Sequence, residues 1–176
     1  GADHCHSVFD RGYENEPGLG SVRNLGVLET IPATSLAPEK VRAILYGGMR
    51  SHLENCIGLC GFLPYSNDQV VEAVRAATGW DTNVWELWKA AERLVTMARV
   101  FNVRHGFTPA DDHLPPRMAE PLGPDGPGAR IDPADVKAAL SLHYEMMGWD
   151  PDTGVPREAK LHELGMAWVA ELLPTA

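Results

Sequence analysis

Apolar residues recur every three or four positions along most of the chain after Pro38, which is the period of an α-helix. The pattern predicts five main helices, over residues 38–58, 66–79, 81–105, 132–147 and 156–173. The third has the clearest stripe, with Asp81 or Thr82 as the expected cap. Its expected apolar face consists of Val84, Leu87, Trp88, Ala91, Leu94, Val95, Ala98 and Phe101. No alternating pattern long enough for a strand occurs, so the predicted fold class is all-α, an irregular multi-helix domain.

Glycine and proline mark the parts of the chain that are not expected to be regular. Residues 1–37 are predicted to be loop-rich, because these residues interrupt every apolar run before it reaches helix length. Residues 108–130 are rich in proline and are expected to form an ordered excursion on the surface. At 176 residues, the chain fits one globular domain, loop-rich over 1–37 and helical over 38–176.

The charge balance excludes some classes of partner. The formal charge is −9, from 24 acidic and 15 basic residues, so no basic surface for nucleic acid is expected. No apolar run reaches the roughly 18–20 residues that span a bilayer. Three cysteines cannot form a closed set of disulfides, which favours a reducing, cytoplasmic location.

Two groups of residues could bind a metal, although neither identifies a reaction by itself. Cys56 and Cys60 lie four residues apart near a helix end, but a closed metal site needs four ligands, and buried, inert cysteines are the simpler interpretation. His4 and His6 share a face of an extended chain, where a solvated or hydrogen-bonded pair is the simpler interpretation. Asp111 and Asp112 are expected to cap turns or to pair with Arg99, Arg104 or Arg117.

Several segments together resemble one enzyme family. Residues 54–60, Glu-Asn-Cys-Ile-Gly-Leu-Cys, resemble the DxxGLC motif of the aldehyde ferredoxin oxidoreductases, which are tungsten-pterin enzymes. Residues 91–107 resemble the family's GERxxNLxRxFNxRxGF run, and residues 111–117 are similar to its DDxLPxR. Further similar segments follow in the family's order up to Leu164-Gly165, and the opening Gly1-Ala2-Asp3-His4 is similar to a histidine-bearing stretch of that fold.

The resemblance implies that residues 1–176 are the C-terminal, mostly helical part of a longer enzyme. In the family, an N-terminal β-rich portion binds a tungsten or molybdenum bis-pterin, and its CxxCxxxC motif supplies three ligands to a [4Fe-4S] cluster. Cys60 occupies the position of the fourth cluster ligand. Both cofactors would require the N-terminal portion, which is therefore an expected partner. The face formed by residues 1–10 and 52–62 is expected to meet that portion and to expose Ile57, Leu59 and Phe62.

The same resemblance assigns further site residues. Asn55, Gly58 and Leu59 occupy pterin-contacting positions, with Asn55 in place of the family's aspartate, and His6 occupies a basic pterin-contacting position. His4 occupies the position of an active-site histidine, which suits it to transfer protons when water attacks an aldehyde.

The leading hypothesis is thus an iron–sulfur oxidoreductase that oxidises aldehydes to carboxylates and passes electrons to ferredoxin. The alternatives are the tungsten subunit of an aromatic-ring-reducing benzoyl-CoA reductase and a stand-alone helical scaffold domain without cofactor. Another electron-transfer subunit could replace ferredoxin, and assembly into a homo-oligomer is left open.

Overall fold

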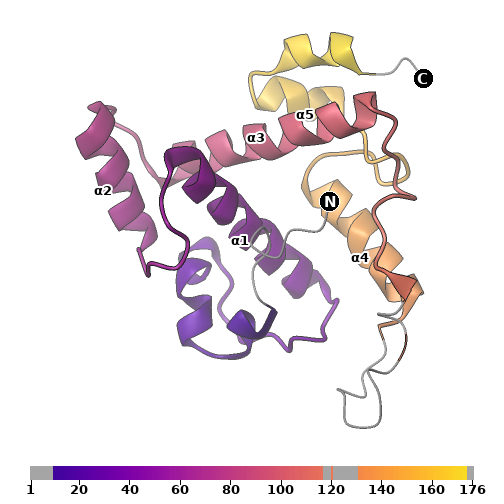
Figure 1. Ribbon diagram of the computed structural model, residues 1–176, viewed down its shortest axis with the longest axis horizontal. Helices are drawn as coiled ribbons and strands as arrows, with labels where there is room; N and C mark the ends of the chain where they lie inside the picture. Colours follow the sequence, from indigo (N-terminus) through magenta and orange to yellow (C-terminus); the bar gives the residue numbers. More distant parts are fainter. Residues whose placement is uncertain (1–9, 117–119, 121–130, 174–176) are drawn as a thin grey trace. The chain divides into compact units, whose positions relative to one another are not determined.

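The computed structural model describes residues 10–116, 120 and 131–173, and Figure 1 traces its elements in chain order. Helices dominate these ranges, which contain no strand and a single isolated β-bridge between Trp149 and Pro156. The all-α prediction is therefore confirmed. The elements are η1 (Asp10–Glu14), η2 (Pro17–Ser21), η3 (Arg23–Leu25), α1 (Pro38–Ile57), α2 (Asn67–Thr78), α3 (Val84–Arg104), α4 (Pro133–Met146), α5 (Glu158–Glu163) and η5 (Ala167–Leu172).

The chain divides into two compact units. The first unit comprises residues 1–33 and 43–97, and the second comprises residues 34–42 and 98–176. Helices α1 and α3 each contribute residues to both units. None of the described helices is both long enough and apolar enough to cross a membrane.

The first unit builds a core from its loop-rich beginning. Short 3₁₀ turns place buried apolar residues against the start of its part of α1, and the Tyr13 hydroxyl donates to the Ala43 carbonyl over 3.0 Å. A Cβ atom at Gly18 would clash with the Gly12 carbonyl oxygen, so only glycine fits there. The core residues are Tyr13, Leu19, Val22, Val27, Ile31 and Ala43.

The signals at the helix ends explain where α2 and α3 begin. Ser66 and Gln69 form the reciprocal capping box that opens α2, as the sequence predicts for this cluster. The expected cap of α3 at Asp81 or Thr82 is wrong. Asn83 is the cap, because its side chain accepts from the Glu86 N–H over 3.0 Å and the Glu86 carboxylate accepts from the Asn83 N–H over 3.1 Å.

The buried face of α3 differs from the predicted stripe toward the end of the helix. Phe101 is 61% exposed, whereas Thr96, Arg99 and Val100 are buried. The polar Thr96 and Arg99 occupy positions that a purely apolar pattern does not assign to the core. Leu87 and Ala91 are buried as predicted.

The second unit contains α4, α5 and η5. Asp132 caps α4 by accepting from the Ala134 N–H over 2.8 Å, with Pro133 in the first turn, as predicted. The predicted fifth helix over 156–173 is wrong as a single element. Gly165 has φ +67°, a left-handed conformation that ends α5, and the chain continues as η5. Both pieces pack into one apolar core with the end of α3, formed by Val100, Leu161, Leu164, Met166 and Val169.

Candidate functional site

The cysteine-bearing motif lies at the end of α1, in the first unit. Helix α1 ends at Ile57, and Gly58 follows with φ +74°, a conformation that favours glycine. The Leu59 N–H then donates to the Glu54 carbonyl over 2.9 Å, which closes the helix end and turns the chain away from the helix axis. Cys60 follows this turn, and its thiol is exposed and not in a disulfide.

Several exposed apolar residues precede and follow Cys60 in the sequence of the first unit, and we call them the motif rim. It comprises Ile57, Phe62, Leu63 and Tyr65, all of them exposed; Phe62 is exposed by 86%. Leu59 is half-buried, and Asn55 and Cys56 are exposed. The expectation that Ile57 and Phe62 are exposed is confirmed, and the buried-cysteine interpretation is wrong because both Cys56 and Cys60 are exposed.

A buried arginine that the sequence reasoning missed fixes this turn. Arg50 donates through Nε to the Glu54 carboxylate over 2.9 Å and through Nη1 to the Asn67 side chain over 2.5 Å. It also donates to the Tyr65 carbonyl, so one guanidinium links α1, the loop after Cys60 and the start of α2. Glu54 is thereby held in a buried ion pair within the first unit. The signal in the sequence is the arginine–glutamate spacing of four on one helix.

Two of the predicted site residues cannot be placed. His4 and His6 lie outside the described residues, and their roles stay predictions. Among the described residues, no three histidine, cysteine, aspartate or glutamate side chains come together to hold a metal ion.

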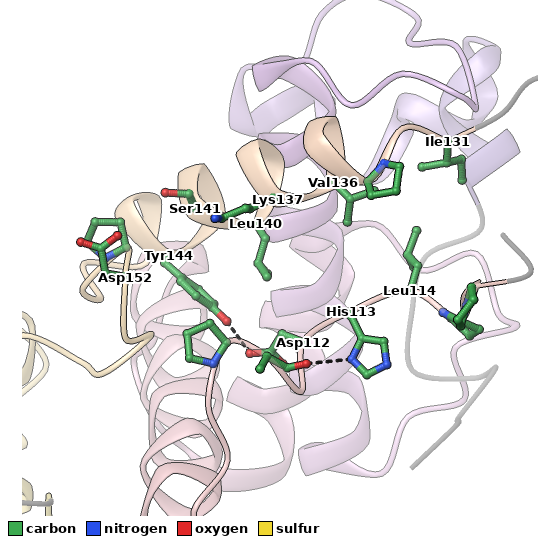
Figure 2. A pocket seen from close by; sticks show the side chains of 16 residues that line it. Asp112, His113, Leu114, Ile131, Val136, Lys137, Leu140, Ser141, Tyr144 and Asp152 are labelled. Atoms are coloured by element: carbon green, nitrogen blue, oxygen red, sulfur yellow. Dashed lines mark hydrogen bonds between the residues drawn. The ribbon is translucent and has the colours of Figure 1, made fainter. Parts of the chain in front are cut away.

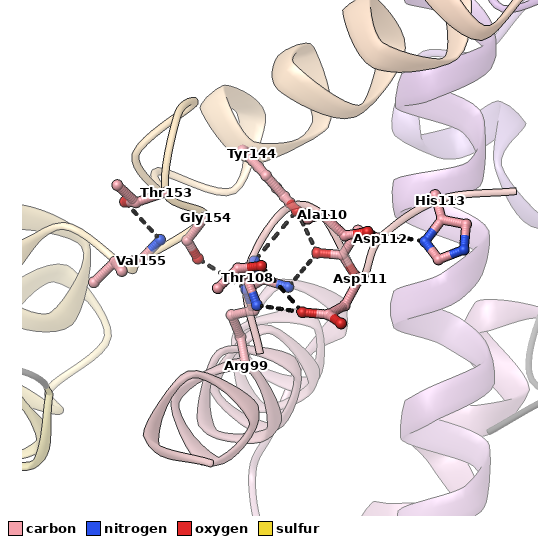
Figure 3. Close-up of polar contacts among 10 residues, drawn as sticks. All are labelled: Arg99, Thr108, Ala110, Asp111, Asp112, His113, Tyr144, Thr153, Gly154 and Val155. Carbon is pink, nitrogen blue, oxygen red and sulfur yellow. Dashed lines mark hydrogen bonds and ion pairs between the residues drawn. The ribbon is translucent and has the colours of Figure 1, made fainter. Parts of the chain in front are cut away.

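A second polar constellation lies wholly within the second unit, around Arg99 (Figure 3). The Arg99 side chain is 7% exposed, and it donates from Nη1 to Asp112 Oδ2 over 2.5 Å and from Nε to the Gly154 carbonyl over 2.9 Å. Its Nη2 lies 3.2 Å from the Tyr144 hydroxyl, which itself donates to Asp112. The guanidinium carbon also lies 5.5 Å from the centre of the Trp149 ring. Arg99 thus joins α3, the loop after it, α4 and the turn at Gly154.

The turn that carries Gly154 is built for this contact. Asp150 Oδ1 accepts from the Thr153 N–H and hydroxyl, each over 2.9 Å, and these hydrogen bonds lower the pKa of Asp150. Gly154 has φ +65°, and a Cβ there would clash with Arg99 Nη2. Glycine is therefore required for Arg99 to approach the backbone.

The predicted arginine–aspartate pairing holds in part. Arg99 and Asp112 form the expected pair. Asp111 instead accepts from the Thr108 N–H over 2.8 Å and from its hydroxyl, and these hydrogen bonds lower the pKa of Asp111. Arg104 is exposed and forms no ion pair with either aspartate in the described part of the chain, and Arg117 lies outside that part.

Burial controls the protonation of two ring side chains near Arg99. Burial, followed by the hydrogen bond to Asp112, raises the pKa of Tyr144 to about 12. Burial also lowers the pKa of His143, with a further contribution from the positive charge of Arg99. Both side chains are therefore neutral at pH 7.

A cavity of about 530 Å³ lies beside this network in the second unit (Figure 2). Its walls come from the loop over residues 109–116, from α4 and from the turn at 151–152. Most of the lining is apolar, including Leu114, Val136 and Leu140, and Asp112 and Tyr144 form part of the wall. No pattern in the sequence predicts this cavity, since its lining comes from three separate segments.

Comparison with known proteins connects these features to one family. Residues 1–166 match the family model described as aldehyde ferredoxin oxidoreductase, domains 2 and 3. The tungsten-containing aldehyde ferredoxin oxidoreductase of Thermococcus kodakarensis is 34% identical over 135 residues, which cover 75% of this chain and 22% of that protein. The protein of the same name from Pyrococcus furiosus is 33% identical, with the same coverage.

More distant relatives carry other names. An aliphatic sulfonate oxidoreductase, WOR-like subunit, of Pyrococcus furiosus is 31% identical over 118 residues, or 61% of this chain and 18% of that protein. Among solved structures, the active site complex BamBC of benzoyl coenzyme A reductase, in complex with 1,5-dienoyl-CoA, aligns with a TM-score of 0.60. At 23% identity over 75% of this chain and 20% of that chain, this likeness supports the fold alone.

The match covers nearly the whole chain, and the chain in turn spans about a fifth of the length of the curated relatives that it matches. The chain belongs to the aldehyde ferredoxin oxidoreductase family, a family of oxidoreductases with tungsten-containing members.

Proposed function

We propose that this chain is the C-terminal part of a tungsten- or molybdenum-pterin enzyme that oxidises aldehydes to carboxylates and passes the electrons to ferredoxin. The exposed thiol of Cys60, in a family motif that ends α1, is the observation that carries this proposal. The relatives named for aldehyde oxidation are 33–34% identical to this chain, against 23% for the benzoyl-CoA reductase complex. Aldehyde oxidation is therefore preferred over aromatic-ring reduction.

The described motif fits an iron–sulfur cluster whose other ligands come from another part of the enzyme. An iron–sulfur cluster needs thiolate ligands, and Cys60 is an exposed cysteine that forms no disulfide. It lies in the segment that follows the glycine turn at the end of α1. Cys60 would supply one ligand, and the remaining three would come from the N-terminal portion of the enzyme.

The neighbouring residues fit contact with a pterin. The Asn55 side chain is exposed, and its amide can both donate and accept hydrogen bonds without adding a charge. The Leu59 N–H is already used by the Glu54 carbonyl, so Leu59 would contact a ligand through its own carbonyl oxygen. Gly58 leaves space at this point because it has no side chain. When bound, the metal-pterin would supply the redox chemistry, and the chain would supply position and hydrogen bonds.

The motif rim fits burial against another part of the enzyme. Ile57, Phe62, Leu63 and Tyr65 are large, exposed apolar residues that lie within five positions of Cys60 in the sequence, and exposed apolar groups of this kind mark interaction surfaces. Covering them would also remove water from the cluster ligand, and burial is one of the factors that set a cluster's potential. A cytoplasmic location suits the exposed thiols, which a reducing compartment preserves.

His4 is proposed as the residue that transfers protons during the reaction. Changing His4→Asn in the complete enzyme should leave both cofactors bound and lower kcat by about 10²–10⁴-fold, the usual loss for such a group. Metal and iron content, measured beside turnover, separate this outcome from cofactor loss. Full turnover in the variant would remove His4 from the reaction.

The test of the proposed function is made on the complete enzyme. Metal analysis is expected to find tungsten or molybdenum together with iron, and addition of an aldehyde is expected to reduce ferredoxin with formation of the matching carboxylate. An enzyme that carries the metal and iron, but that fails to reduce ferredoxin whichever aldehyde is added, would contradict the proposal. An enzyme without either metal would favour the scaffold alternative.

A further inference from the structure

The cavity of the second unit has the size and lining of a small-molecule site. Its volume of about 530 Å³ falls within the range of roughly 300–1,000 Å³ that is usual for ligand pockets. Leu114, Val136 and Leu140 supply an apolar wall, and Pro109 and Pro151 add rigid apolar surface. These residues all belong to the second unit, whereas the motif around Cys60 belongs to the first.

The polar groups of the cavity favour a ligand that donates a hydrogen bond. Both side-chain hydrogen bonds to Asp112, from Arg99 and from Tyr144, end on Oδ2, and Oδ1 has no partner among the described residues. The Asp112 side chain is 32% exposed and forms part of the cavity lining. Figure 2 shows Asp112 and Tyr144 together at the cavity, beside the apolar side chains.

The charged residues at the cavity favour an uncharged ligand over an anion or a cation. Asp152 adds a second carboxylate to the lining, which disfavours an anionic ligand. The Asp112 charge is already compensated by Arg99 at 2.5 Å, and Lys137 adds a positive charge on α4, so a cationic ligand gains little. The Asp112 carboxylate can still accept a hydrogen bond at Oδ1, while Arg99 balances its negative charge. An uncharged hydroxyl group can donate that hydrogen bond.

We propose that this cavity is a binding site for a small, uncharged, apolar alcohol, whose hydroxyl donates to Asp112 Oδ1 and whose apolar body packs against Leu114, Val136 and Leu140. This site goes beyond the proposed aldehyde oxidation and does not depend on it. Its residues include neither Cys60 nor any other residue assigned to cofactor binding.

Three probes of similar shape test the ligand class on the complete enzyme. Benzyl alcohol carries the hydroxyl, toluene lacks it, and benzoate replaces it with a negative charge. Calorimetric or ligand-detected NMR titration is expected to show saturable binding of benzyl alcohol, with toluene weaker by a few-fold to about tenfold, the effect of one hydrogen bond. Benzoate should be weaker still. Absence of saturable benzyl alcohol binding, or equal binding of benzoate, would overturn the proposal.

Two matched variants on α4 test the location. Val136→Trp places a large side chain in the cavity and should abolish binding of benzyl alcohol, whereas Ala138→Trp adds the same side chain at an exposed position outside the lining and should leave binding unchanged. If Val136→Trp fails to fold, the methyl NMR signals of Leu114, Val136 and Leu140 in the unmodified protein provide the second readout. Binding that survives in a folded Val136→Trp variant, or that leaves these methyl signals unshifted, would show that the alcohol binds elsewhere.

Discussion

Arg99 is the residue whose contacts explain most about the second unit. Its guanidinium is buried, and hydrogen bonds to Asp112, Tyr144 and the Gly154 carbonyl satisfy it. A buried charge is costly unless it is paired and hydrogen-bonded. The guanidinium of Arg99 can therefore be buried only because these three partners accept its hydrogen bonds. The sequence predicted the Arg99–Asp112 pair from the turn after α3. It could not predict Tyr144 or Gly154, which lie 45 and 55 residues away.

Removing this guanidinium should destabilise the fold. Arg99→Ala leaves the Asp112 carboxylate without its ion-pair partner and the Gly154 carbonyl without its donor, so the free energy of unfolding should fall by about 3 kcal/mol. Arg104→Ala on the same helix is the matched control, because Arg104 is exposed; its effect should stay within about 0.5 kcal/mol. Denaturant unfolding of both variants makes the comparison. Equal effects would mean that the Arg99 network does not stabilise the fold.

Tyr144 gives a second test at the residue scale. Its pKa is raised to about 12, above the value near 10 of an unfolded tyrosine, so the folded state holds its proton more tightly. The stability contributed by this shift is present below pH 10 and is lost as the pH rises from about 10 to about 12. Titration of tyrosinate absorbance should show a late component that Tyr144→Phe removes. If Tyr144→Phe leaves the late part of the curve unchanged, the assignment to Tyr144 is wrong.

At the scale of elements, glycine conformation decides where the last helices end. Gly165 adopts φ +67° and separates α5 from η5, whereas Gly48 lies inside α1 with open space around its Cα. The same substitution should therefore have opposite effects. Gly165→Ala should destabilise by about 1–2 kcal/mol because of the left-handed backbone. Gly48→Ala should stabilise by roughly 0.5–1 kcal/mol because alanine favours the helix. Thermal or denaturant unfolding measures both, and a stabilising Gly165→Ala would contradict the helix break.

Local signals in the sequence predict these elements well, and long-range packing limits the prediction. The starts of α2 and α4 follow from Ser66 and Asp132, since a cap depends on neighbours within three residues. The prediction of the buried face of α3 was partly wrong, because Arg99 can be buried only when residues distant in the sequence pair with its charge. Periodicity continued the fifth helix through Gly165, although a left-handed glycine ends it there.

At the scale of the whole molecule, the candidate site could be predicted only through the family motifs. The spacing of Cys56 and Cys60 alone favoured inert, buried thiols, and the structure exposes both. The motif singled out Cys60, whereas Arg50 and the cavity required the fold, since each combines residues from separate segments. The chain spans 22% of the length of the aldehyde ferredoxin oxidoreductases that it matches, and we propose that the exposed apolar residues of the motif rim meet a further part of the enzyme.

The most direct test of the account compares Cys60→Ala with Cys56→Ala in the complete enzyme. Both thiols are exposed near the end of α1 and the change is identical, but only Cys60 is proposed as a cluster ligand. Iron content and the EPR spectrum of the reduced enzyme should show a lost or converted cluster in Cys60→Ala and an intact cluster in Cys56→Ala. Equal loss in both variants, or an unchanged cluster in Cys60→Ala, would contradict the assignment.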